Sequence, residues 1–248
     1  MIQANSKHNV IFIKKNDMKK IIRLKESDLK NIINESVKKI YEARLEGFRV
    51  DAITNAETFD ERINYCIQML GKPIGIGSSR IVFQIDDDSV LKLARNEKGI
   101  WQNYEEIALG TNTEFSCFPK ILNGTDEKNC LWIISEFVLP IKNDDFIRLL
   151  RIPFIHIKKF IYAVKDYCKR KEGGKETLDS LYKRYSRNKN VTNLFNDIYK
   201  LYVKYKNDIW DLTRTFNWGI CNRNGVATPV ILDIGFSIEV KNNLYKKE

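Results

Sequence analysis

Two glycines and one strand lysine have the spacing that most directly suggests phosphate chemistry. Gly75 and Gly77 belong to the segment Gly-Ile-Gly-Ser-Ser-Arg-Ile-Val-Phe, which covers 75–83 and opens an alternating apolar strand. After a short acidic turn, Lys92 follows on a second, otherwise apolar strand. Glycines let backbone N–H groups approach phosphate oxygens closely, and a neighbouring lysine supplies positive charge. The segment therefore predicts a β-hairpin that wraps around the phosphates of a nucleotide.

The length and composition of the chain are typical of a folded protein. Its 248 residues can form one large domain or two small lobes, and a hydrophobic content of 43% excludes the disordered class. No apolar run approaches the roughly 20 residues that span a bilayer. The N-terminus also lacks the apolar core of a signal peptide. We therefore expect a cytoplasmic protein without a membrane partner.

The cysteines and the net charge limit the kinds of partner. Five cysteines lie far apart without a C-x-x-C pair, and the chain has two histidines, so reduced thiols are expected rather than a structural zinc site. The net charge of +10 suits either a nucleic-acid partner or a solvated, lysine-rich surface. Charge alone does not separate these two interpretations.

The apolar periodicity predicts a small sheet followed by a helical region. Before residue 140 the pattern predicts helices over 26–44, 60–70 and 99–109 and strands over 81–85, 90–94, 118–122 and 131–138. After it, the pattern predicts helices over 144–150, 153–168, 177–185 and 191–209, then strands over 218–221 and 229–232. The strands and their one inserted helix make an antiparallel sheet lobe.

The predicted helix over 26–44 is amphipathic, with an apolar face opposite its lysines. It either packs on the main domain or docks on a partner or a second copy. The stretch from Met18 to Leu29 resembles a leader found in proteins of gut bacteria and their phages. Met18 is then a candidate natural start, and the residues before it a variable extension.

The order of the motifs resembles the protein-kinase-like fold: a glycine loop, a strand lysine, a helix glutamate, an apolar strand, a helical region and a final Asp-Ile-Gly. The resemblance implies an α+β protein with two lobes, a small antiparallel β N-lobe and a minimal helical C-lobe. The implied organisation is an N-terminal extension with its helix over 1–48, an N-lobe over 49–139 and a C-lobe over 140–248.

The resemblance assigns the glycine loop to the phosphates. Gly75, Gly77 and Val82 match the two glycines and the valine of G-x-G-x-x-G-x-V, and Arg80 replaces the third glycine. The N–H groups around Ser78 and Ser79 would still face phosphate. Val82 would cover the adenine.

The same resemblance extends to the rest of the nucleotide pocket. Lys92 would hold the α- and β-phosphates, with Glu106 as its helix partner and Glu105 as the alternative. The Glu136 carbonyl and the Val138 amide would hydrogen-bond the adenine edge, because exposed backbone at a lobe junction needs such a partner.

Three later residues are the candidates for metal binding and catalysis. Asp233 resembles the aspartate of D-F-G and would hold Mg²⁺, although it could instead cap a strand end. Asn217 resembles the asparagine that shares the metal. Asp211 is the candidate catalytic base or a loop-positioning residue. No His-Arg precedes it, and its interval to Asn217 is one residue longer than in the kinase pattern.

The resemblance implies a phosphotransferase that binds ATP and Mg²⁺ and transfers the γ-phosphoryl group to an unknown acceptor. Little of the chain follows Gly235, so the helices that hold a peptide substrate in protein kinases are missing. The acceptor is then an unidentified protein or small molecule. The alternative is a catalytically weak pseudokinase that acts as a protein- or nucleic-acid-binding module.

Overall fold

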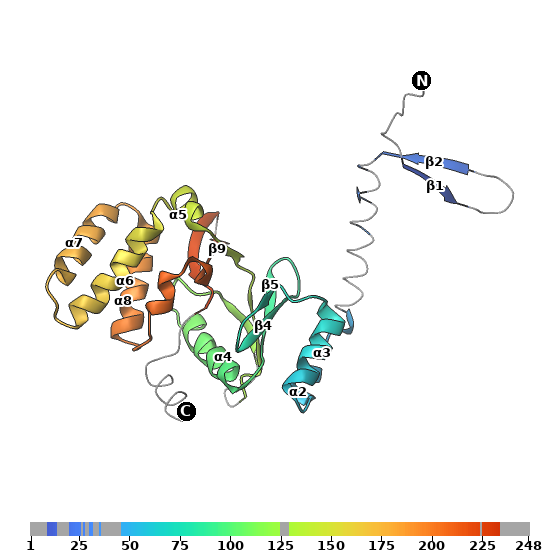
Figure 1. The fold of residues 1–248 in the computed structure, drawn as a ribbon, viewed down its shortest axis with the longest axis horizontal. Coiled ribbons are helices and arrows are strands. Elements are labelled where there is room, and N and C mark those ends of the chain that lie inside the picture. The colour runs from blue at the N-terminus through green and yellow to red at the C-terminus, as the bar shows by residue number, and fades with distance from the viewer. Residues whose placement is uncertain are drawn as a thin grey trace, which may run out of the picture. The chain divides into compact units, whose positions relative to one another are not determined.

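The computed structural model describes residues 9–13, 20–25, 27, 30–31, 35, 46–124, 129–223 and 225–233. The chain divides into two compact units, Met1–Val50 and Asp51–Glu248. In the first unit, β1 (Asn9–Ile13) and β2 (Lys20–Leu24) pair antiparallel (Figure 1). The sequence has no clear period over 1–24 and does not predict this hairpin. The helix predicted over 26–44 lies largely outside the described residues.

The second unit contains a five-stranded antiparallel sheet with the strand order β3-β4-β5-β7-β6 (Figure 1). Its strands are β3 (Gly75–Ile76), β4 (Arg80–Gln84), β5 (Ser89–Ala94), β6 (Ile121–Gly124) and β7 (Trp132–Glu136). The acidic turn joins β4 to β5 because the Asp86 carboxylate accepts hydrogen bonds from the Asp88 N–H at 2.9 Å and the Ser89 hydroxyl at 2.8 Å.

Three helices accompany this sheet. They are α2 (Val50–Asn55), α3 (Phe59–Leu70) and α4 (Glu97–Gly110). Thr58 and Glu61 form a capping box that starts α3, and the buried Arg62 donates to the Ile53 carbonyl at 3.1 Å. Helix α4 lies between β5 and β6 in sequence and packs against β5 and β7.

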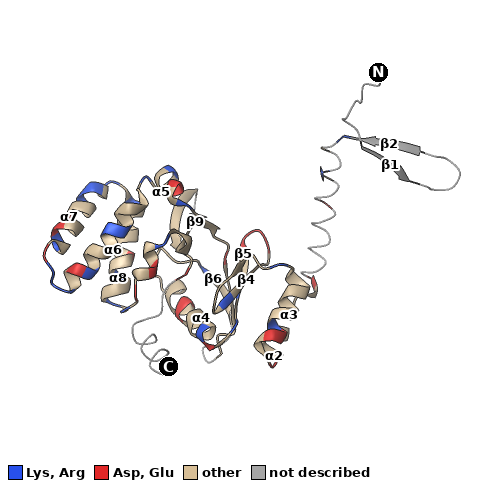
Figure 2. Ribbon diagram, in the orientation of Figure 1, with Lys and Arg blue, Asp and Glu red and all other residues tan. Residues whose placement is uncertain are grey.

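The rest of the second unit is mainly helical, with α5 (Asn143–Leu150), α6 (Phe154–Cys168), α7 (Gly174–Tyr185) and α8 (Lys189–Val203). A buried aromatic core joins them, in which the rings of Phe160 and Phe195 stack at 4.0 Å. Lysine and arginine residues lie along α6 and α7 (Figure 2). None of the described helices has both the length and the apolar character needed to cross a membrane.

Several predicted boundaries differ from the structure by a few residues, and two of the differences have a clear structural cause. Helix α8 ends at Val203 rather than near 209, because Lys206 adopts a left-handed φ of 56° and the Asn207 N–H bonds the Leu201 carbonyl at 3.0 Å. This hydrogen bond spans six residues, so the chain has left the α-helical path here. The strand predicted over 118–122 begins at Ile121, because Phe118 instead joins the core of the helical part.

A second, three-stranded sheet connects the chain after β7 to the last described segment. It consists of β8 (Leu139–Pro140), β9 (Trp218–Arg223) and β10 (Val226–Ile231) in the order β10-β9-β8. Gly225 has a φ of 77° at the tight turn between β9 and β10, a conformation that glycine adopts without strain. Two 3₁₀ turns, Trp210–Thr213 and Thr215–Asn217, precede β9.

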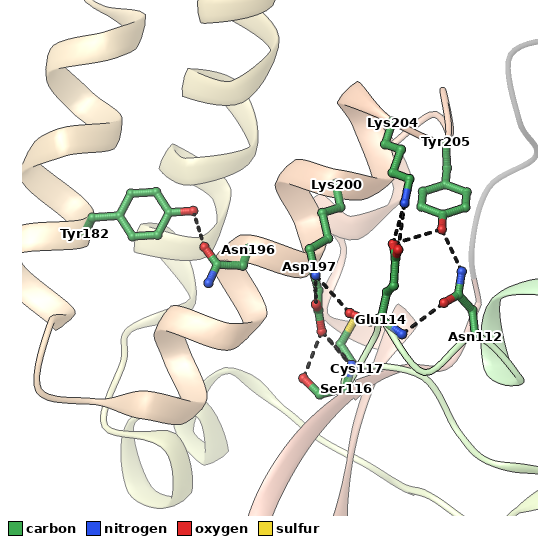
Figure 3. Close-up of polar contacts among 10 residues, drawn as sticks. All are labelled: Asn112, Glu114, Ser116, Cys117, Tyr182, Asn196, Asp197, Lys200, Lys204 and Tyr205. Atoms are coloured by element: carbon green, nitrogen blue, oxygen red, sulfur yellow. Dashed lines mark hydrogen bonds and ion pairs between the residues drawn. The ribbon is translucent and has the colours of Figure 1, made fainter.

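A polar cluster ties the loop that follows α4 to α8 (Figure 3). We call it the α8 network; its residues are Asn112, Glu114, Ser116, Cys117, Asp197, Lys200, Lys204 and Tyr205. The buried Asp197 carboxylate accepts from the Ser116 N–H and hydroxyl, both at 2.8 Å, and from the Cys117 N–H at 3.2 Å. Glu114 accepts from Lys204 at 2.6 Å and from Tyr205 at 3.1 Å. The network therefore fixes the C-terminal end of α4 against the helical part.

The architecture is α+β, with an antiparallel sheet and several helices, as the sequence predicts at this coarse level. The five cysteines, all within the described part of the chain, form no disulfide, and four of them are buried. Burial raises the pKa of Cys66 to about 12, so this thiol stays protonated at neutral pH.

Candidate functional site

A cleft of about 770 Å³ lies among β3, β4, β5, the chain between β7 and β8, and the segments that flank the β9–β10 hairpin. It is lined by most of the residues that the sequence singles out, namely Gly75, Gly77, Ser78, Val82, Lys92, Glu136, Val138, Asn217 and Asp233. Two candidates are not on its lining. Glu106 lies behind Lys92, with which it pairs, and Asp211 lies elsewhere on its 3₁₀ turn.

The glycine loop, residues 75–79, is held through its carbonyl groups. The Gly77 carbonyl accepts a hydrogen bond from the Arg95 guanidinium at 2.5 Å, and the Ser78 carbonyl accepts one from the Asn96 amide at 3.1 Å. In a trans peptide each C=O points away from the following N–H. The N–H groups of Ser78 and Ser79 therefore point away from Arg95 and Asn96. Within the described part of the chain neither N–H has a protein acceptor, so both remain for a ligand.

Helix α4 begins directly against this loop. Asn96 caps it by accepting from the Gly99 N–H at 3.2 Å. A Cβ at Gly99 would overlap the Ser79 carbonyl oxygen, so glycine permits the close approach of helix and loop. The Ser79 hydroxyl also donates to the Gln102 side chain at 2.5 Å. These contacts fix α4, and with it Glu106, relative to the glycine loop.

Lys92 and Glu106 form a buried ion pair, with 5% and 3% of their surfaces exposed. The structure thus selects Glu106 over Glu105, which is buried as well, as the partner of Lys92. Burial alone would raise the pKa of Glu106, but the charges of Lys92 and Arg80 outweigh it and hold this pKa below its ordinary value. Burial lowers the pKa of Lys92, which Glu106 opposes.

Arg80 is the site residue that the sequence motif does not reveal. Its side chain is 9% exposed, and Nη1 contacts Glu106 Oε2 at 2.5 Å while Nη2 contacts Asp233 Oδ1 at 2.9 Å. The alternation of side chains along β4 could have identified it. Arg80 lies two residues before Val82 and therefore on the same face, and Val82 pairs in register with Lys92. We call Arg80, Lys92, Glu106 and Asp233 the cleft cluster.

The chain after β7 supplies a backbone edge. The Glu136 side chain accepts hydrogen bonds from the Lys120 N–H at 3.1 Å and from Arg223 at 2.9 Å, so its carboxylate has a structural use. The Phe137 N–H donates to the Asp88 carbonyl at 2.7 Å. Among the described residues the Val138 N–H has no acceptor. This segment can therefore offer a backbone donor to a ligand.

Asn217 and Asp233 are brought together by the β9–β10 hairpin. The Leu232 N–H donates to the Asn217 carbonyl at 2.8 Å, which places the residue before Asp233 beside Asn217. The buried Asn217 side chain uses Nδ2 to donate to the Asp211 carbonyl at 2.9 Å. Its Oδ1 accepts no hydrogen bond from the described residues. The Asp233 side chain is half exposed, and both residues line the cleft.

The Asp211 side chain has a different environment. It is 46% exposed and lies 3.6 Å from the guanidinium of Arg214, which directly follows the same 3₁₀ turn. Its backbone carbonyl, rather than its carboxylate, holds Asn217. The geometry gives Asp211 a positioning contact, and its role as a base stays a prediction.

The described residues contain no group of three or more His, Cys, Asp or Glu side chains arranged to hold a metal ion. A cation at this cleft would take ligands from Asp233 and Asn217 and complete its shell with phosphate or water oxygens. No protein-family model and no curated protein sequence matches this chain.

Proposed function

We propose that this cleft binds ATP with Mg²⁺ and that the chain is a compact kinase-like phosphotransferase. The observation that carries the proposal is the Lys92–Glu106 pair, buried at a cleft that the glycine loop and Asp233 also line. In protein kinases a strand lysine paired with a helix glutamate holds phosphates, and a later aspartate holds Mg²⁺. The antiparallel sheet with its inserted helix α4 is the arrangement expected for the N-lobe.

The cleft has the size and lining that a nucleotide requires. Its volume of about 770 Å³ is within the usual range for ligand pockets. Val82 and Val90 line it with apolar surface suited to a base, and the Val138 N–H is an available donor for the adenine edge. On the glycine loop, the Ser78 and Ser79 N–H groups are available to phosphate oxygens.

Phosphoryl transfer mainly needs positioning and charge neutralisation. Lys92 would hold the α- and β-phosphate oxygens, and Mg²⁺ bound through Asp233 and Asn217 would neutralise charge on the phosphates. The acceptor oxygen forms a bond to the γ-phosphorus while the bond to the β-phosphate oxygen breaks. The acceptor proton then passes to a base, for which Asp211 is the candidate.

The proposal is tested by thermal unfolding with millimolar ATP and MgCl₂. A ligand at about 100 times its Kd should raise the Tm by roughly 5 to 10 °C. Lys92→Met and Asp233→Ala should abolish this increase. Lys175→Met, which alters an exposed ion pair on α7, should keep it. No increase for the wild-type protein would remove the proposal.

The Asp211–Arg214 contact favours a second candidate, a nucleotide-binding module without turnover. In this case the nucleotide supports binding of a protein or nucleic acid, and the basic residues along α6 and α7 are the candidate contact surface. Asp211→Asn separates the two candidates. If ATP binds the wild type but neither protein releases phosphate or autophosphorylates, the module is supported; if Asp211→Asn alone loses turnover, the enzyme is.

A further inference from the structure

Arg80 is the second cation of the cleft cluster, and Glu106 is paired with Lys92 without it. Its guanidinium joins Glu106, which already has Lys92 as a partner, to Asp233, which has no other ion pair among the residues that the structure describes. We propose that Arg80 is a phosphate-binding residue, and that its guanidinium pairs with Asp233 until a phosphate ligand binds in the cleft. This inference rests on the proposed function, because it assigns a residue of the same cleft to the same phosphates.

The two ends of the Arg80 contact differ in what surrounds them. Nη1 faces Glu106 and, at 3.4 Å, the Asn103 side chain, and both of these residues are buried. Asn103 is itself held, because its Nδ2 donates to the Cys130 carbonyl at 2.8 Å. Nη2 faces Asp233, whose side chain is half exposed at the cleft. Nη2 can therefore change its partner while Nη1 stays anchored.

The charges of the cleft cluster explain why such an exchange is favourable. Two cations and two anions balance one another when the cleft holds no ligand. A polyphosphate brings several negative charges beside Asp233, which repels them. Turning Nη2 from Asp233 to a phosphate oxygen gives the phosphate a charge-assisted hydrogen bond. Asp233 is then free to bind a divalent cation, so Arg80 and the cation compete for Asp233 but both favour phosphate.

The geometry requires arginine at this position. A guanidinium has donors in a planar fork, so it can hold Glu106 and Asn103 on one side and a phosphate on the other. A lysine has a single nitrogen and could not reach both sides. A glycine, as in the kinase pattern, would leave Asp233 without this cation.

The experiment measures binding of ATP and of tripolyphosphate by calorimetry, once in EDTA and once in MgCl₂. Asp233→Asn should strengthen binding in EDTA, because it releases Arg80 and removes a repelling charge, and weaken it in MgCl₂. Arg80→Gln should weaken binding in EDTA by about tenfold, the size of one charge-assisted hydrogen bond. It should also lower the MgCl₂ concentration needed for half-maximal binding.

The double variant Arg80→Gln/Asp233→Asn should lose most of the gain that Asp233→Asn shows in EDTA. Arg148→Gln is the matched control, because this exposed arginine pairs with Asp145 on α5 and should bind as the wild type does. Asp233 is half exposed, so its variant provides the test even where Arg80→Gln does not fold.

Unchanged or weaker binding of Asp233→Asn in EDTA would overturn the inference. If the wild-type protein binds ATP and Arg80→Gln binds it with the same affinity, the inference about Arg80 is also wrong, but the proposed function is unaffected. A third outcome is that the protein binds tripolyphosphate but not ATP, and that Asp233→Asn binds tripolyphosphate more strongly in EDTA. This would support phosphate binding by Arg80 and contradict the proposal of a nucleotide site. Binding of neither probe would remove both.

Discussion

The cleft cluster and the α8 network both use charged side chains, but they differ in how completely protein groups satisfy those charges. In the α8 network one oxygen of Asp197 accepts three hydrogen bonds from Ser116 and Cys117. In the cleft cluster, Arg80 and Lys92 share two acids beside an open cavity. The α8 network therefore fixes a position, whereas the cleft cluster can exchange a protein partner for a ligand.

The largest effect is expected from Glu106→Ala, because it leaves two buried cations without their shared acid. We expect a loss of about 3–5 kcal/mol in the free energy of unfolding, measured by urea denaturation. Adding Lys92→Met should recover part of this loss by removing one of the unpaired charges. Glu97→Ala, at an exposed position in the first turn of the same helix, is the control and should cost within about 1 kcal/mol. Equal losses for the two glutamates would contradict the importance of the buried cluster.

Asp197→Ala should have the next largest effect, a loss of about 3 kcal/mol in the free energy of unfolding. Three donors from Ser116 and Cys117 would lose a buried charged acceptor. Asp197→Asn retains an oxygen and should lose less. Both variants should bind ATP as the wild type does at a temperature where they are folded. A clear drop in affinity would show that the α8 network also shapes the cleft, and the contrast between the two clusters would fail.

The smallest expected effect is the change in the stability contributed by Glu106 at acidic pH. The pKa of Glu106 is lowered from its ordinary value of 4.5, with burial opposed by the stronger effect of Lys92 and Arg80. As pH falls below about 4.5, the unfolded chain binds this proton before the folded one does. The stability that Glu106 contributes is thus complete above that pH and is lost as the pH falls through the lower, folded value.

Urea midpoints measured between about pH 6 and pH 3 check this expectation. The wild-type midpoint should fall more steeply than that of Glu106→Gln, which has no carboxyl to titrate. Glu114→Gln is the comparison from the α8 network. The pKa of Glu114 is also lowered, chiefly by Lys204, but this ion pair is exposed and salt should screen it. Parallel curves for wild type and Glu106→Gln would refute the assignment.

Much of the sheet and of the cleft lining is readable from the sequence. Alternation along β4 and β5 places Val82 and Lys92 on one face. The order of the motifs offers Glu105 or Glu106 as the partner of Lys92. The less accurate predictions lie where tertiary contacts override local pattern. The end of α8 depends on the left-handed Lys206, and Phe118 belongs to the helical core instead of a strand.

The sequence alone determined where the glycine loop and the strand lysine lie, because each is defined by a pattern of residues a few positions apart. The order of the motifs is read directly from the chain. The tertiary structure decided that Glu106 is the partner of Lys92 and that Arg80 meets Asp233, 153 positions away in the chain. It also left Asp211 off the cleft lining. A side chain at a motif position acquires its electrostatic partners only when distant segments pack together, and no local pattern specifies that packing.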